Sequence, residues 1–166
     1  GVNDICVFNE ADETILSVSE NLAARRFAFN CRQFNEYRAW ISEQTICFHT
    51  PDDGDQHVDC TDIPLAGRHN LENVSAAGLA VLAVGGSISG IQSALQNFKG
   101  LPHRVEYVDT VNNVRFYDDS KATNVDAVAR ALESFSSPVI IIMGGRDKGG
   151  GYEGLRKQFA RCVKQL

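Results

Sequence analysis

The sequence Val139-Ile140-Ile141-Ile142-Met143 is apolar at every position and lacks the polar–apolar alternation of a half-exposed strand. Strands covered on both faces have this pattern, and they occur mainly in the parallel sheets of α/β proteins. A glycine-rich stretch from Gly144 to Gly151 follows, and a helical pattern begins at about Glu153. The sequence therefore predicts a parallel strand, a loop at its carboxyl end and a helix that covers the sheet.

The residues immediately before this strand predict a hairpin and a helix. Residues 104–108 and 114–117 flank Asn112-Asn113, a pair that tolerates the positive φ angles of a tight turn. Thr123, with Asp126 three residues later, resembles a capping box that would open the next helix. The apolar positions expected to face the core from that helix are Val125, Val128, Leu132 and Phe135.

The first part of the chain predicts a strand and a helix followed by a small sheet. Residues 5–8 are apolar, and the segment from Ile15 to Leu22 has a helical pattern. Short apolar stretches between Arg25 and Asp62, separated by turn residues, predict a small antiparallel meander.

Two helices and a break are expected in the middle of the chain. Asn70 is predicted to cap a helix that runs through the Ala-rich stretch to Val84 and ends at Gly85-Gly86, and Ser87 to cap a second helix. The sequence Lys99-Gly100-Leu101-Pro102 then interrupts the helical pattern. We therefore expect a domain boundary here, after which the residues build only about half of a usual α/β domain.

Composition excludes several classes of function. The 166 residues contain 16 Lys and Arg against 21 Asp and Glu, a formal net charge of −5, which argues against nucleic-acid and anionic-membrane partners. No apolar run approaches the roughly 20 residues of a membrane-spanning helix. The five cysteines are an odd number without Cys-x-x-Cys pairs, and the four histidines have no metal-ligand spacing with them. These features predict a cytoplasmic protein with reduced cysteines and no metal site of its own.

Three polar clusters lie where an α/β sheet binds ligands, at strand ends and helix N-termini. They are residues 118–124, the glycine-rich loop with Lys148, and residues 67–73, in which Asn70 and Asn73 share a helical face. His103-Arg104 is a further candidate because arginine suits anionic partners. Each cluster also has a structural explanation as helix caps or a surface turn. No lysine follows the Gly-x-x-x-x-Gly-Lys-[Ser/Thr] pattern, so the chain has no Walker phosphate loop.

Four blocks taken together resemble the Mur ligase family. They are Gly67-Arg68-His69-Asn70-x-x-Asn73, Gly100-Leu101-Pro102-His103-Arg104, Asp119-Ser120-Lys121-Ala122-Thr123-Asn124 and Gly144-Gly145-x-x-Lys148, and the resemblance extends from about Ile5 to the end of the chain. The third block is the most discriminating, because it is similar to that of the members that add D-glutamate. Other members typically have an Asp-x-x-His sequence there.

The resemblance implies an ATP- and Mg²⁺-dependent amide ligase of peptidoglycan biosynthesis. Its substrates would be UDP-N-acetylmuramoyl-L-alanine, D-glutamate and ATP, joined through an acyl phosphate. By resemblance, residues 1–98 would end the central, ATP-binding α/β domain with its small antiparallel meander. Residues 99–166 would form the first half of the Rossmann-like, C-terminal, amino-acid-binding domain. Residues Asn70, Asn73, Arg104 and Asp119 would then contact ATP, and Lys121, Thr123 and Lys148 would hold D-glutamate.

Departures from the family pattern lead to a further expectation. The phosphate loop, the Mg²⁺ ligands and a modified lysine would lie before Gly1, and a serine-containing block would lie after Leu166. The chain also begins with Gly1 and contains methionine only at position 143. We therefore expect a piece of a longer polypeptide, inactive as a ligase without the rest. The alternatives are a sister ligase of the Mur or folylpolyglutamate type, and a non-catalytic nucleotide-binding module.

Overall fold

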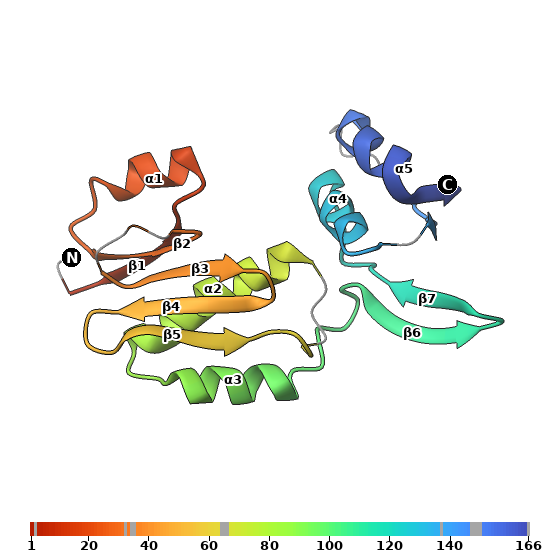
Figure 1. Cartoon of the computed structure of the whole chain (residues 1–166). Coiled ribbons are helices and arrows are strands. Elements are labelled where there is room, and N and C mark those ends of the chain that lie inside the picture. Colours follow the sequence, from red (N-terminus) through yellow and green to blue (C-terminus); the bar gives the residue numbers. More distant parts are fainter. Residues whose placement is uncertain are drawn as a thin grey trace. The chain divides into compact units, whose positions relative to one another are not determined.

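The computed structural model describes residues 1, 3–31, 33, 36–63, 67–136, 138–146 and 151–165. The chain divides into two compact units, Gly1–Phe98 and Lys99–Leu166. Each unit has its own sheet or hairpin and its own helices (Figure 1).

The first unit is built on a five-stranded mixed sheet with the strands in sequence order. Its strands are β1 (Ile5–Asn9), β2 (Arg25–Phe29), β3 (Arg38–Ser42), β4 (Thr45–Thr50) and β5 (Gly54–Asp59). Strands β1, β2 and β3 pair in parallel, whereas β3, β4 and β5 pair antiparallel. The prediction of an antiparallel meander over the whole of residues 25–62 was therefore wrong for β2. The helix between β1 and β2 returns the chain to the end of the sheet at which β1 begins, so β2 runs parallel to β1. Short apolar stretches in the sequence do not indicate the direction of a strand.

Neighbouring residues of a strand point to opposite faces of the sheet, so apolar side chains lie on both faces. Helices cover each of these faces. Helices α2 (Arg68–Ala83) and α3 (Ile88–Asn97) contribute to the main core, in which Phe27, Ile46, Phe48, Val58 and Leu79 are fully buried. Helix α1 (Glu13–Ser19) covers the other face at β1 and β2, where Leu16 packs on Phe8, Ala28 and Cys31. Helix α1 ends at Ser19, so Leu22 lies beyond it and is exposed.

The ends of the two longer helices show which caps the sequence predicts correctly. Ser87 caps α3 by accepting a hydrogen bond from the Gly90 N–H, as predicted. Asn70 does not cap α2, because the helix begins earlier and its N-cap is Gly67 at φ 95°. At the other end Gly85 adopts φ 85°, and the Gly86 N–H donates to the Val81 carbonyl, which closes α2 where the glycines predicted its end.

The second unit contains a hairpin and a strand–helix–strand unit. Strands β6 (Glu106–Val111) and β7 (Val114–Asp118) pair antiparallel around Asn112 and Asn113, both with positive φ, which confirms the predicted hairpin. The remaining elements are α4 (Val125–Glu133), β8 (Val139–Ile140), the 3-10 turn η1 (Glu153–Leu155), α5 (Arg156–Cys162) and β9 (Val163–Gln165). Leu132, Leu155 and Cys162 form its buried centre.

Two predictions for this unit were wrong in detail. Asn124, not Thr123, caps α4, because its side chain accepts from the Ala127 N–H. The apolar run 139–143 forms a strand only at Val139–Ile140, which pairs in parallel with β9. Ile142 is 97% exposed, since β9 is the only strand beside β8 in the described part of the chain.

Two properties of the whole described chain bear on its chemistry. All five cysteines are free, and burial raises the pKa of the Cys60 thiol. None of the described helices combines the length and the apolarity required to cross a bilayer.

Candidate functional site

In the second unit, residues 101–106, here called the Arg104 loop, are hydrogen-bonded to residues 118–124, here called the acidic loop. The Val105 N–H donates to Asp119 Oδ1 at 3.1 Å, and the Lys121 N–H donates to the His103 carbonyl at 3.1 Å. Arg104 lies between these two attachments. The structure thus brings together three of the sequence-predicted site residues: Arg104, Asp119 and Lys121.

The acidic loop is itself held by local hydrogen bonds. The Ala122 N–H donates to the Asp119 carbonyl at 2.8 Å, and the Thr123 N–H to the Lys121 carbonyl at 2.9 Å. Asn124 caps the following helix, so this task does not fall to Thr123. Lys121 and Thr123 are exposed, whereas Asp119 is half-buried. The exposed residues Lys121 and Thr123 therefore lie on a loop whose backbone is hydrogen-bonded.

Asp119 illustrates how a structural and a binding role can coexist. Its Oδ1 accepts from the Val105 N–H, which is a structural use of the side chain. An ionised carboxylate has two oxygens and about four acceptor positions, so one such side chain can both hold a loop and accept from a hydroxyl group.

His103, Glu106 and Asp118 form a cluster beside Arg104. His103 Nδ1 lies 2.7 Å from Asp118 Oδ2, and the His103 N–H donates to Glu106 Oε2 at 2.7 Å. One potential metal-ligand atom from each residue lies within 4.8 Å of the others. Because these atoms already bond one another or the backbone, the cluster is a hydrogen-bonded link between the two loops, and we assign no metal to it.

The Asp118 carboxyl is held in its ionised form. The hydrogen bond from His103 lowers the pKa of Asp118, and the hydrogen bond from the Ser120 N–H lowers it further. An ionised carboxylate can only accept, so His103 Nδ1 carries the shared proton.

This arrangement predicts the effect of removing the imidazole. We expect His103→Gly to raise the pKa of Asp118 toward its ordinary value, while Ser120 still holds it below that value. Glycine is the suitable replacement because His103 has φ 64°. A lowered folded-state pKa stabilises the fold above the unfolded pKa, and this contribution is lost as pH falls through the folded pKa. The variant should therefore lose less stability on acidification. Carboxyl ¹³C shifts followed through a pH titration measure the pKa, and an unchanged value would contradict the assignment.

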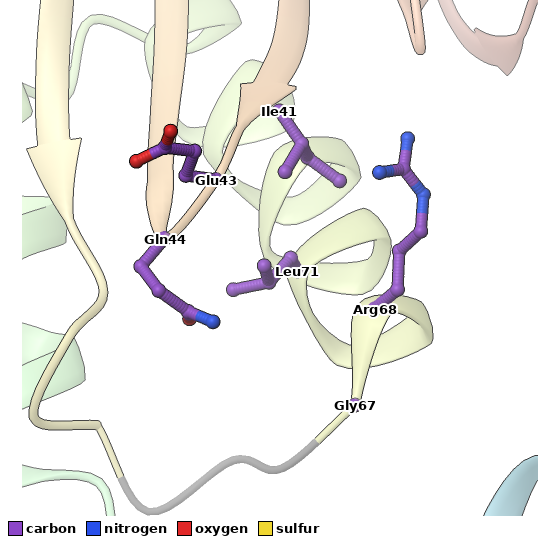
Figure 2. A pocket seen from close by; sticks show the side chains of 6 residues that line it. All are labelled: Ile41, Glu43, Gln44, Gly67, Arg68 and Leu71. Atoms are coloured by element: carbon purple, nitrogen blue, oxygen red, sulfur yellow. The ribbon is translucent and has the colours of Figure 1, made fainter. Parts of the chain in front are cut away.

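In the first unit, the predicted residues Asn70 and Asn73 lie in the first turns of α2. Asn70 is half-buried and Asn73 is exposed. Next to them, the helix start and the β3–β4 turn enclose a pocket of about 150 Å³, shown in Figure 2. Its lining residues are Ile41, Glu43, Gln44, Gly67, Arg68 and Leu71. The pocket has apolar side chains from Ile41 and Leu71 with charged groups beside them, and the two asparagines do not line it.

The glycine-rich loop is only partly covered by the structure. Gly144, Gly145 and Arg146 are exposed, and Gly145 has φ 129°. Lys148, predicted to bind the amino acid, lies outside the described residues.

Sequence reasoning missed Asp118 and Glu106 as partners of His103. Asp118 is the last residue of β7, whereas the structural explanation offered for residues 118–124 was a helix cap. The Asn112-Asn113 turn could have indicated this pairing, because a tight turn there determines which residues of the two strands lie opposite each other. Glu106 pairs with Asp118 in that register, after a one-residue shift between Tyr107 and Asp109.

Many curated proteins are similar in sequence to this chain, although no family model matches it. One from Desulfosudis oleivorans is 41% identical over 97% of the chain, and one from Desulfatibacillum aliphaticivorans is 43% identical over 98%. One from Bacillus subtilis is 36% identical over 99% of the chain. The chain spans 36%, 36% and 35% of the lengths of these relatives.

Solved structures agree at the level of the fold. A crystal structure of MurF from Acinetobacter baumannii has a TM-score of 0.59 at 24% identity, over 78% of this chain and 28% of that one. A UDP-N-acetylmuramoylalanyl-D-glutamyl-2,6-diaminopimelate–D-alanyl-D-alanyl ligase from the same organism has a TM-score of 0.56 at 25% identity, over 80% and 30%. The predicted α/β class is thereby confirmed.

The fold, the order of the polar blocks and these relatives place the chain in the Mur ligase family. The three relatives described above are each named UDP-N-acetylmuramoylalanine–D-glutamate ligase, and they are similar to this chain over nearly all of its residues.

Proposed function

We propose that this chain is a working segment of an ATP-dependent ligase that joins D-glutamate to UDP-N-acetylmuramoyl-L-alanine in the cytoplasm. The observation that carries the proposal is the pair of loops in the second unit, the Arg104 loop and the acidic loop, which are hydrogen-bonded to each other. These loops hold Arg104, Asp119 and Lys121 in one place, within a chain whose relatives have this activity in their names.

Nucleotide binding is assigned to four residues. Arg104 supplies a permanent cation for the phosphates, and Asp119 supplies an acceptor for a ribose hydroxyl. Asn70 and Asn73 supply carboxamides, which can both donate to and accept from an adenine edge. The exposed Asn73 and the half-buried Asn70 follow one another on the same side of α2, which supports this use.

D-Glutamate binding is assigned to Lys121, Thr123 and Lys148. A dicarboxylate that leaves water needs charged or hydroxyl donors, or its desolvation is uncompensated. Lys121 and Thr123 are exposed donors of these kinds, two residues apart on the acidic loop. Their contribution to the reaction is orientation: they hold the amine of the amino acid where it can attack an activated carboxyl carbon.

The two units are proposed to have separate parts in the ligase. Gly1–Phe98 would be the end of the ATP-binding domain, and Lys99–Leu166 the beginning of the amino-acid-binding domain. The phosphate loop and the Mg²⁺ ligands are not assigned to this chain. Its sequence has no Walker pattern, and Mg²⁺, which would neutralise phosphate charge in the reaction, is given no ligand here.

A direct assay tests this division of labour. The chain alone should form no amide from UDP-N-acetylmuramoyl-L-alanine, D-glutamate and ATP, because it lacks the residues that activate the carboxylate. Amide formation is measured by mass spectrometry of the product. Turnover by the isolated chain would contradict the proposal that the phosphate chemistry depends on other residues.

A further inference from the structure

Arg104 has an unusual backbone setting. Its neighbours His103 and Val105 adopt φ values of 64° and 47°, in the left-handed region. This region is unfavourable for residues other than glycine, and particularly so for a β-branched residue such as valine. Such conformations persist only where surrounding contacts hold them, and they gather at functional sites.

Hydrogen bonds from both directions hold the two residues in this conformation. Val105 donates its N–H to Asp119, and the His103 carbonyl accepts from the Lys121 N–H. The His103 N–H donates to Glu106 Oε2, and its imidazole meets Asp118 Oδ2. Arg104 itself is tied only through its backbone in these contacts, by its N–H to the Leu101 carbonyl. The loop therefore fixes the start of the Arg104 side chain and leaves its exposed end for a ligand.

Asp118 connects the two loops more directly than any other side chain of the cluster. Its Oδ2 meets His103 Nδ1 at 2.7 Å, and its Oδ1 accepts from the Ser120 N–H at 2.9 Å. One carboxylate thus joins the Arg104 loop to the first turn of the acidic loop. Both carboxylate oxygens of Asp118 take part in hydrogen bonds within the protein, so contact with a substrate does not explain its position.

We propose that Asp118 is a positioning residue, which acts through His103 to hold Arg104 and Asp119 in the arrangement that binds a nucleoside triphosphate. The inference rests on the proposed function, because it takes ATP as the ligand of Arg104. It goes beyond that function by giving a role to two residues, Asp118 and His103, that touch no substrate in it.

The sign of the Asp118→Asn effect separates positioning from simple electrostatics. A carboxylate near a phosphate site repels the phosphate, so neutralising it would strengthen ATP binding if charge were its only effect. The asparagine side chain has one acceptor oxygen, so it cannot accept from both His103 Nδ1 and the Ser120 N–H. Loss of either bond weakens the connection between the two loops that holds the Arg104 backbone, and we expect ATP affinity to fall about tenfold. The two explanations predict opposite changes.

The experiment uses the full 166-residue chain, with ATP titrated and the backbone amide signals followed by NMR. Asp118→Asn is compared with His103→Gly, which removes the imidazole side of the link, keeps the Asp118 charge and suits φ 64°. Asp109→Asn is the matched control, because Asp109 lies on β6 of the same hairpin and its carboxylate accepts only from its neighbour Thr110 in the described contacts. Both link variants should bind ATP more weakly, and the control should bind like the unmodified chain or slightly more tightly.

A second measurement tests the link without any ligand. Amide hydrogen exchange at Val105 and Lys121 should become about tenfold faster in both link variants and stay unchanged in Asp109→Asn. Unchanged exchange in the link variants would overturn the inference.

The outcomes of the titration also separate the two proposals. If the unmodified chain binds ATP at Arg104 and Asp118→Asn binds it equally well or better, the inference is wrong and the proposed function stands. If ATP produces no shift at Arg104 in the unmodified chain, the nucleotide assignment fails, and the positioning role fails with it.

Discussion

Phe48→Ala is expected to destabilise the first unit by about 3–5 kcal/mol, the range observed when a fully buried aromatic ring is removed. Phe48 has no exposed surface, and it lies at the centre of the core between the sheet and α2. Its ring packs directly on Gly78, where an added Cβ would lie only 2.4 Å from Phe48 Cζ. Because the helix approaches β4 so closely here, its backbone cannot easily move inward to fill the space left by the ring.

Urea unfolding followed by circular dichroism measures this loss in the full chain. Typical domains are stable by only about 5–15 kcal/mol, so the variant should unfold at a much lower denaturant concentration. Val84→Ala provides the control, because Val84 is 85% exposed and its truncation should change stability by about 0.5 kcal/mol or less. Equal stability of Phe48→Ala and Val84→Ala would mean that the core is misassigned.

Lys121→Ala is expected to lower the use of D-glutamate by about 10²-fold, the effect of losing a hydrogen bond between charged groups in a closed site. The effect requires a complete ligase. We therefore place it in a hybrid enzyme in which this chain replaces the homologous segment of the Bacillus subtilis relative, 36% identical over 99% of the chain. Because Lys121 is assigned to the amino acid and not to ATP, the loss should occur in kcat/KM for D-glutamate, with the KM for ATP nearly unchanged.

Lys157→Ala is the matched control for this hybrid. Lys157 is an exposed lysine of α5 in the same unit, so its removal changes the charge equally without touching the acidic loop. Equal kcat/KM values for D-glutamate in the two variants would remove Lys121 from the amino-acid site.

Local features of this fold could be predicted from sequence, and arrangements between distant segments could not. The Asn112-Asn113 turn, the Ser87 cap and the Gly85 end of α2 depend on residues a few positions apart, and all were predicted correctly. The direction of β2 depends on its partners β1 and β3, which its own sequence does not specify. The burial expected for Ile142 likewise depends on neighbouring strands and helices, and in the described chain it is almost fully exposed.

The candidate site shows the same limit. The family resemblance assigned Arg104 and Asp119 to ATP and Lys121 to D-glutamate, and the structure brings these residues onto two connected loops. No residue type in this segment indicated that His103 and Val105 would adopt left-handed backbone, because neither is glycine. That conformation results from hydrogen bonds to residues about fifteen positions away, which only the folded hairpin brings close.

Ligation by the hybrid enzyme tests the central claim, that this chain supplies nucleotide and amino-acid contacts to a ligase specific for D-glutamate. The measurement is ATP-dependent amide formation from UDP-N-acetylmuramoyl-L-alanine, with D-glutamate, L-alanine and diaminopimelate offered separately, and with circular dichroism to establish that the hybrid is folded. We expect product with D-glutamate and essentially none with the other two amino acids. A folded hybrid that forms no product, or that prefers another amino acid, would contradict the claim.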